Sequence, residues 1–153
     1  MKNLIFASLS AVMLAGTLVP FATAKETAPL VVDASQSLVA QAPVIASGGF
    51  VTVDQDHATT GTARIVEENG QRYIEFDAAF DTARGPDVQV VLYTGDTVPV
   101  SIAEEDYTVV ADLESFEGAQ RYALPASVDL DAYGAIAIWC AEFNVTFGYA
   151  NLG

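Results

Sequence analysis

From Gly48 onward, short runs of β-branched and aromatic residues alternate with clusters of Gly, Pro, Asp and Asn. This pattern is typical of β-strands joined by turns. No segment has the long 3.6-residue period of an amphipathic helix, so the pattern predicts an all-β fold, a single antiparallel β-sandwich domain. The predicted strands are 50–53, 61–66, 72–76, 88–93, 107–111, 120–124, 134–140 and 143–150.

Two turns are predicted from the types of residue that they contain. Asn69-Gly70 separates the second and third predicted strands, and this dipeptide favours a two-residue hairpin because both positions take positive φ. Gly85-Pro86-Asp87 predicts a turn that leads into the strand 88–93.

The last two predicted strands surround the only cysteine of the chain. Period-2 alternation places Ile138 and Cys140 on one face and Trp139 on the other, where the indole is expected to pack. Apart from Trp139, the large residues of these strands stand at even positions up to Cys140 and at odd positions from Phe143 onward. Because a slip of one residue reverses the facing of every side chain, a tight turn or a bulge is predicted at Ala141-Glu142. The large residues expected to share one face of the next run are Phe143, Val145, Phe147 and Tyr149.

Residues 1–24 have the features of a cleavable secretory signal peptide. Lys2 precedes an apolar run that begins at Leu4, and small residues precede the expected cleavage after Ala24. An uncleaved membrane anchor is the alternative, but polar residues interrupt a run already short against the ~20 residues that span a bilayer. The mature protein is therefore expected to be secreted or periplasmic, with no membrane span after cleavage.

Residues 25–47 are rich in Ala, Ser, Val and Pro and have no sustained period. They are predicted to be a linker or a loosely attached arm, although their apolar stretches could add an edge strand. The domain is predicted over residues 48–153.

The net charge of the chain limits the classes of molecule that it can bind. Without the signal peptide the chain has five basic and twenty acidic residues, a net charge of −15. Nucleic acid and anionic membranes are excluded as partners, because proteins bind phosphates through clustered Lys and Arg. The acidity is compatible with a cation or a basic protein as partner, or with solubility alone.

Counting ligands removes most cofactor sites. The mature chain has one cysteine, Cys140, one histidine, His57, and no methionine. Iron–sulfur clusters, covalent haem and blue copper all need more ligands of these kinds, and a disulfide scaffold needs more cysteines. A bare thiol remains possible, as do Cys140 and His57 as axial ligands of a non-covalent haem.

Each candidate residue also has a purely structural interpretation. A free cysteine often packs as a small hydrophobe, whereas a reactive one needs cationic or hydrogen-bonding neighbours. His57 lies in a predicted loop between Asp54 and Asp56, which could orient the ring, or it is an ordinary solvated histidine. Carboxylates of this loop and of residues 77–87 could bind calcium, although no EF-hand loop is present.

Several ordered groups of residues together resemble a known family. They are Gly49-Phe50, His57 with Gly61-Thr62-Ala63, Phe80, Gly85-Pro86-Asp87 before Val90 to Tyr93, Gly118 to Pro125, and the ending with Ile138-Trp139-Cys140, Phe143-Asn144-Val145 and Phe147-Gly148. This order resembles the DM-thirteen (DM13) domain, an electron-transfer module of Skeletor-type extracellular proteins that often accompanies haem-binding DOMON domains. The resemblance implies that Cys140 is the signature cysteine, a bare redox thiol or a ligand of a prosthetic group such as haem. It also implies that His57 is a family histidine.

The first hypothesis is therefore an exported redox or electron-transfer accessory domain rather than a stand-alone enzyme. In it Cys140 is the redox centre, His57 is a second ligand or an orienting group, and the partner is an unidentified redox protein. The alternative is a non-catalytic extracellular binding or adhesion module whose acidic loops contact a cation or a protein. A thiol hydrolase using Cys140 and His57 ranks last, because no oxyanion-hole motif accompanies the pair.

Overall fold

The computed structural model describes residues 41–153, which form β-strands, two short 3-10 helices and loops. Among these residues there is no α-helix, so the predicted all-β class is confirmed. None of them forms a helix that is long and apolar enough to cross a membrane. The elements are β1 (Val44–Thr52), β2 (Thr59–Thr60), β3 (Thr62–Glu68), β4 (Gln71–Phe76), β5 (Asp81–Thr82), β6 (Val88–Tyr93), η1 (Glu104–Asp106), β7 (Tyr107–Asp112), β8 (Gln120–Leu124), η2 (Leu130–Ala132), β9 (Ala135–Cys140) and β10 (Val145–Asn151).

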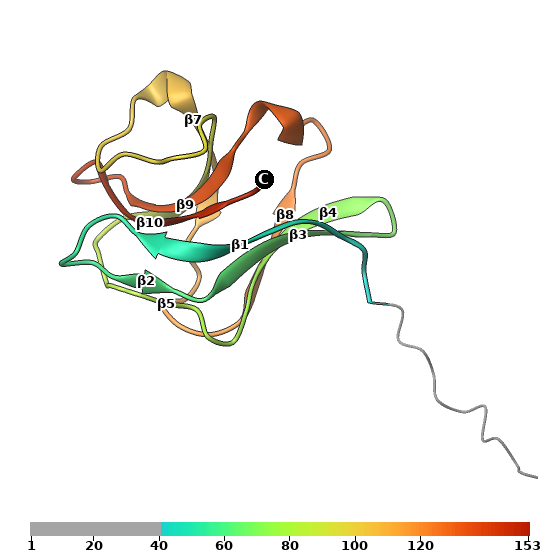
Figure 1. Ribbon diagram of the computed structural model, residues 1–153, viewed down its shortest axis with the longest axis horizontal. Helices are drawn as coiled ribbons and strands as arrows, with labels where there is room; N and C mark the ends of the chain where they lie inside the picture. Colours follow the sequence, from blue (N-terminus) through green and yellow to red (C-terminus); the bar gives the residue numbers. More distant parts are fainter. Residues whose placement is uncertain (1–40) are drawn as a thin grey trace, which may run out of the picture. The chain divides into compact units, whose positions relative to one another are not determined.

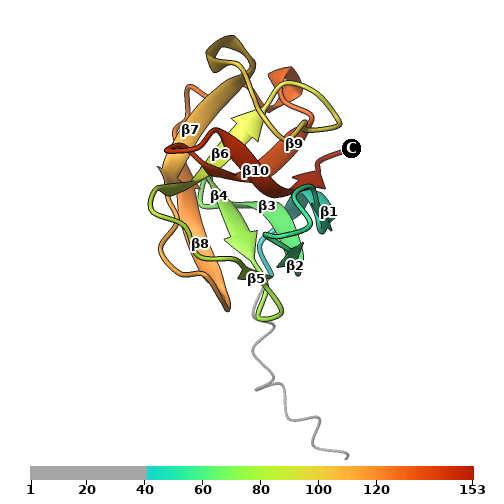
Figure 2. The same ribbon diagram turned by 90° about the vertical axis from the view of Figure 1, so that its left-hand side faces the viewer.

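Eight strands form one antiparallel sheet in the order β7-β6-β9-β10-β1-β3-β4-β8, and β2 pairs with β5 separately. The large sheet turns at β1, whose first part pairs with β3 and whose end pairs with β10. Its two halves face each other as a sandwich that is nearly closed like a barrel (Figures 1 and 2). At this turn a Cβ on Gly48 would lie 2.1 Å from the carbonyl oxygen of Asn151, so the close approach requires glycine.

The core has two parts. The larger one fills the space between the two halves of the sheet, and the smaller one lies on the other face of β6 and β9. The smaller part includes Val98 and Ile102 from the segment between β6 and β7, which covers that face. Strand β9 is consequently buried on both faces, which explains its unbroken apolar sequence and places Cys140 at the end of a fully buried strand.

The predicted strands agree with the observed ones to within two residues at each end, except at the start of β1. The Asn69-Gly70 hairpin is present with φ of 54° and 78°, and it joins β3 to β4 as predicted. β1 begins at Val44, inside the interval that the sequence predicts to be a linker, so residues 44–47 belong to the sheet. The predicted signal peptide and the rest of the predicted linker up to residue 40 lie outside the described residues. The two-residue strands β2 and β5 are too short to give a periodic signal.

The facing of β10 differs from the prediction. A turn at 141–144 follows Cys140, as predicted, but the register of β10 against β9 shifts between Thr146 and Gly148. Val145 and Phe147 share the inner face, as predicted, but the bulge reverses the facing after Phe147, so Tyr149 packs on the outer face and its predicted common face with Phe147 is wrong. Phe143 lies in the turn and is 67% exposed.

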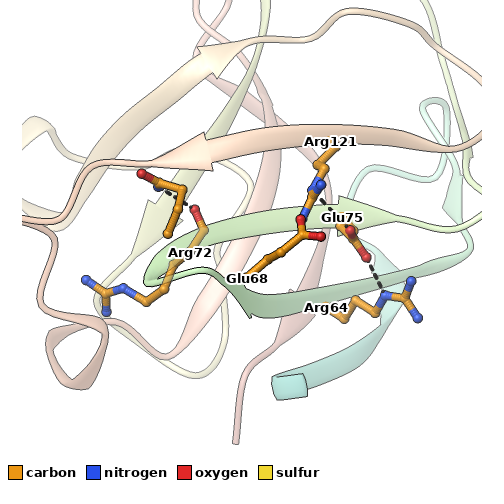
Figure 3. A network of polar contacts seen from close by, with 6 residues as sticks. Arg64, Glu68, Arg72, Glu75 and Arg121 are labelled. Atoms are coloured by element: carbon orange, nitrogen blue, oxygen red, sulfur yellow. Dashed lines mark hydrogen bonds and ion pairs between the residues drawn. The ribbon is translucent and has the colours of Figure 1, made fainter. Parts of the chain in front are cut away.

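A row of charged side chains crosses the outer surface of β3, β4 and β8 (Figure 3). Arg64 donates to Glu75 at 2.8 Å, and Arg121 contacts Glu75 at 3.2 Å and Glu68 at 2.6 Å. The hydrogen bond with Glu68 raises the pKa of Arg121, and its guanidinium also lies over the Tyr73 ring. Three of the strands are thereby joined by side chains at the surface, in addition to their backbone hydrogen bonds.

Candidate functional site

Cys140 lies at the end of β9, between Val88 of β6 and Val145 of β10. Its thiol is free and 1% exposed, and it faces the inner core as the alternation predicts. Gly85 is a neighbour of the sulfur, because a Cβ on Gly85 would lie 3.6 Å from Sγ. Cys140 is therefore both a core residue and a neighbour of the Gly85-Pro86-Asp87 turn.

Cys140 and His57 line the same pocket, although they are far apart in the sequence. The pocket has a volume of about 220 Å³. Its remaining wall is aromatic and aliphatic except for one arginine, and no carboxylate lines it. The lining residues are His57, Arg84, Gly85, Pro86, Cys140, Phe143, Val145 and Phe147.

His57 is held from two sides. Its Nδ1 lies 2.9 Å from Oδ2 of Asp54, and its ring stacks on Phe147 with centroids 4.4 Å apart and planes 7° apart. The Asp56 backbone N–H, and then His57, donate hydrogen bonds to Asp54 and lower the pKa of that carboxyl. An ionised Asp54 only accepts, so Nδ1 of His57 carries a proton and Nε2 is the acceptor of the neutral ring. Of the two predicted orienting residues, Asp54 takes this role, while Asp56 acts through its backbone.

Arg84 belongs to the pocket and is absent from the sequence-based candidates. Its guanidinium lies 5.1 Å from the centre of the Phe116 ring. Within residues 41–153 it makes no ion pair, whereas Arg64 and Arg121 bond carboxylates and Arg72 donates to the Val128 carbonyl. The signal that could have found it is its place directly before Gly85-Pro86-Asp87, in a long stretch without another Lys or Arg.

Asn144 fixes the turn that carries Phe143, and the sequence-based candidates also miss this role. It has a positive φ of 48°. Its Oδ1 accepts hydrogen bonds from the Ile102 backbone N–H and from Nε1 of Trp139, each at 3.0 Å, and its Nδ2 donates to the Ile102 carbonyl. Trp139 packs on the outer face, as predicted, with its ring centre 4.8 Å from that of Tyr107.

The acidic loops do not assemble a metal site in the described part of the chain. Among residues 41–153, no three His, Cys, Asp or Glu side chains lie together in a way that could hold a metal ion.

The family model described as electron transfer DM13 matches residues 50–152, about two thirds of the chain. The chain belongs to the electron-transfer DM13 family. The match extends from the end of β1 to the end of β10, so the DM13 region includes Cys140, His57, Arg84 and every other residue that lines their pocket. No curated protein and no solved structure matches the chain.

A haem does not fit between Cys140 and His57 of this DM13 domain. Pockets for drug-sized ligands have volumes of ~300–1,000 Å³, and a porphyrin is larger than most such ligands. The pocket holds about 220 Å³, Cys140 is 1% exposed, and Phe147 covers one face of the imidazole. The pocket instead has the dimensions for a small group that approaches the thiol.

Proposed function

We propose that this DM13 domain transfers electrons through Cys140 as a bare thiol. The observation that carries the proposal is that Cys140 lines a pocket together with His57 and Arg84. A reactive thiol needs cationic or hydrogen-bonding neighbours, and the lining of this pocket contains a guanidinium and an imidazole in a strongly acidic protein. A cysteine that only packs in the core does not need such a pocket.

The proposed chemistry is thiol–disulfide exchange with two electrons per cycle. The Cys140 thiolate attacks one sulfur of a partner disulfide, that S–S bond breaks, and the leaving sulfur takes the electron pair and a proton. A dithiol donor closes the cycle: its first thiol attacks the Cys140-bound disulfide at the Cys140 sulfur and releases the other half of the partner as a thiol, and its second thiol then attacks the first thiol's sulfur and releases Cys140. Two electrons thus pass from the dithiol, which becomes a disulfide, to the partner disulfide, which becomes two thiols, and Cys140 returns to its initial state.

We assign His57 a supporting role in this exchange. Asp54 and Phe147 hold its ring, and Nε2 is the proton acceptor of the neutral imidazole. His57 would therefore take the proton that Cys140 loses on becoming a thiolate and give it to the leaving sulfur. In this role His57 moves a proton and forms no covalent bond.

We also propose that the protein acts after export, in a periplasm or outside the cell. Residues 1–24 have the charge, the apolar run and the small residues of a signal peptide. Disulfides persist in these oxidising compartments, so a partner disulfide is available there. The strong negative charge of the mature chain favours a redox partner with a basic surface.

Two variants of Cys140 test the proposed function. Cys140→Ser and Cys140→Ala should both abolish electron transfer to a disulfide substrate, measured as release of the product thiol. Cys140→Ser should also lower the free energy of unfolding by ~1–3 kcal/mol, because it buries a hydroxyl among apolar neighbours. Cys140→Ala introduces no polar group and serves as the control for packing. Full activity in a folded variant would refute the redox role and favour the alternative of a binding module.

A further inference from the structure

The pocket beside Cys140 has an electrostatic character opposite to that of the molecule. Residues 41–153 contain four arginines and eighteen acidic residues. Three other hollows on this domain are each lined by at least one carboxylate, namely Asp96 and Asp131, Glu68 and Glu75, and Glu75 again. The pocket beside Cys140 is lined by Arg84 and His57 and by no acidic residue.

Arg84 is available to a ligand in a way that the other arginines are not. It is exposed, and within the described residues its recorded contact is with the Phe116 ring, which leaves its N–H groups without a carboxylate. A guanidinium of this kind binds carboxylates through two parallel hydrogen bonds. Stacking on Phe116 keeps the guanidinium at the pocket.

The size of the pocket limits the ligand to a small molecule. A water molecule occupies about 30 Å³ of the liquid, so 220 Å³ corresponds to roughly seven waters. One half of a small disulfide has a comparable size. An extended protein segment would have to place a single short side chain in it.

We infer that this pocket selects small carboxylate-bearing disulfides and thiols, with the carboxylate at Arg84 and the sulfur at Cys140. The inference rests on the proposed redox role of Cys140 and adds to it the class of substrate. In the exchange, the Cys140 sulfur forms a bond with one sulfur of the small disulfide. The S–S bond breaks, and the second half leaves with the electron pair and the proton that Cys140 gives up.

The test compares three small disulfides of similar length on the reduced mature protein. Dithiodipropionate is anionic, hydroxyethyl disulfide is neutral and cystamine is cationic. The rate at which each one modifies native Cys140 is measured from the mass of the mixed disulfide. The ratio of the anionic to the cationic rate is then compared between variants, which removes the intrinsic reactivity of each disulfide.

Arg84→Gln should lower this ratio about fivefold, which is the upper end of what an exposed ion pair contributes to a binding equilibrium. Arg84→Lys should retain part of the preference. Arg64→Gln is the matched control, since it removes the same charge from the surface row of Figure 3 and should leave the ratio unchanged. Circular dichroism of each variant verifies that it is folded.

The outcomes separate the two proposals. Equal ratios in the wild-type protein and in Arg84→Gln, with native Cys140 reacting, would overturn the anionic selectivity and leave the redox role intact. A native thiol that reacts with none of the three disulfides, while the unfolded protein reacts with all of them, would overturn both.

Discussion

Cys140 has core residues on one side and the pocket on the other. Ile138 precedes it on the same inner face, and Gly85 lies beside its sulfur. Bulky reagents are consequently kept from the thiol, and the proposed chemistry needs a small group that enters the pocket. Burial of this kind is compatible with redox chemistry when a pocket, rather than the outer surface, supplies the substrate.

Tyr122 is a second residue whose burial has a measurable consequence. Its hydroxyl accepts a hydrogen bond from the Glu114 backbone N–H at 3.0 Å and donates one to Oε1 of Gln120. Burial raises the pKa of Tyr122 from 10.0 to about 12, because the charged phenolate is poorly solvated inside the domain.

This shift predicts a loss of stability in alkali. The unfolded state gives up the phenol proton near pH 10 and the folded state near 12. The contribution of Tyr122 to the free energy of unfolding is therefore full below pH 10 and falls as the pH rises toward 12. The free energies of unfolding of the wild-type protein and of Tyr122→Phe, measured with denaturant, should therefore converge as the pH rises from 10 toward 12. A difference that stays constant between pH 9 and the folded pKa would contradict the assignment.

At the scale of elements, the turn between β9 and β10 connects the fold to the pocket. Asn144 ties this turn to the segment before η1 and to the Trp139 indole, and the same turn presents Phe143 at the pocket. Phe147 lies at the bulge that follows and faces inward, where it supports the His57 ring. The turn and the bulge together set the shape of the pocket.

Replacing Asn144 tests this connection. Asn144→Gly keeps the positive φ but loses three hydrogen bonds, so the free energy of unfolding should fall by ~1–3 kcal/mol. The fluorescence of Trp139, the only tryptophan, should shift to longer wavelength as water reaches the indole. Glu142→Gly, a glycine in the same turn at an exposed position, is the control and should leave the fluorescence unchanged. Equal effects of the two variants would show that Asn144 does not hold the turn.

Sequence patterns predict the elements of this domain better than they predict its site. The ranges of β6 and β8, the hairpin at Asn69-Gly70 and the turn after Cys140 follow from alternation and turn chemistry. The bulge at Phe147 does not, because large residues continue at odd positions as far as Tyr149 and hide the change of face. Nor does alternation show that β1 changes partner between β3 and β10.

At the scale of the whole molecule, the order of the strands creates the pocket. Alternation shows which side chains of one strand share a face, but it gives no information on which strands and loops meet. The sequence could therefore nominate Cys140 and His57 singly, while their common pocket depends on β9, β10, the loop after β1 and the turn before β6. Arg84 becomes a candidate only through this convergence.

The measurement that tests the central claim most directly is made on the mature domain purified from its native compartment. Its absorption spectrum is recorded, and its thiol is titrated with a small disulfide in the native and in the unfolded state. The account predicts a spectrum without a haem band and one thiol that reacts in the native protein and is missing in Cys140→Ser. A haem band that disappears in Cys140→Ser, or a thiol that reacts only after unfolding, would contradict the account.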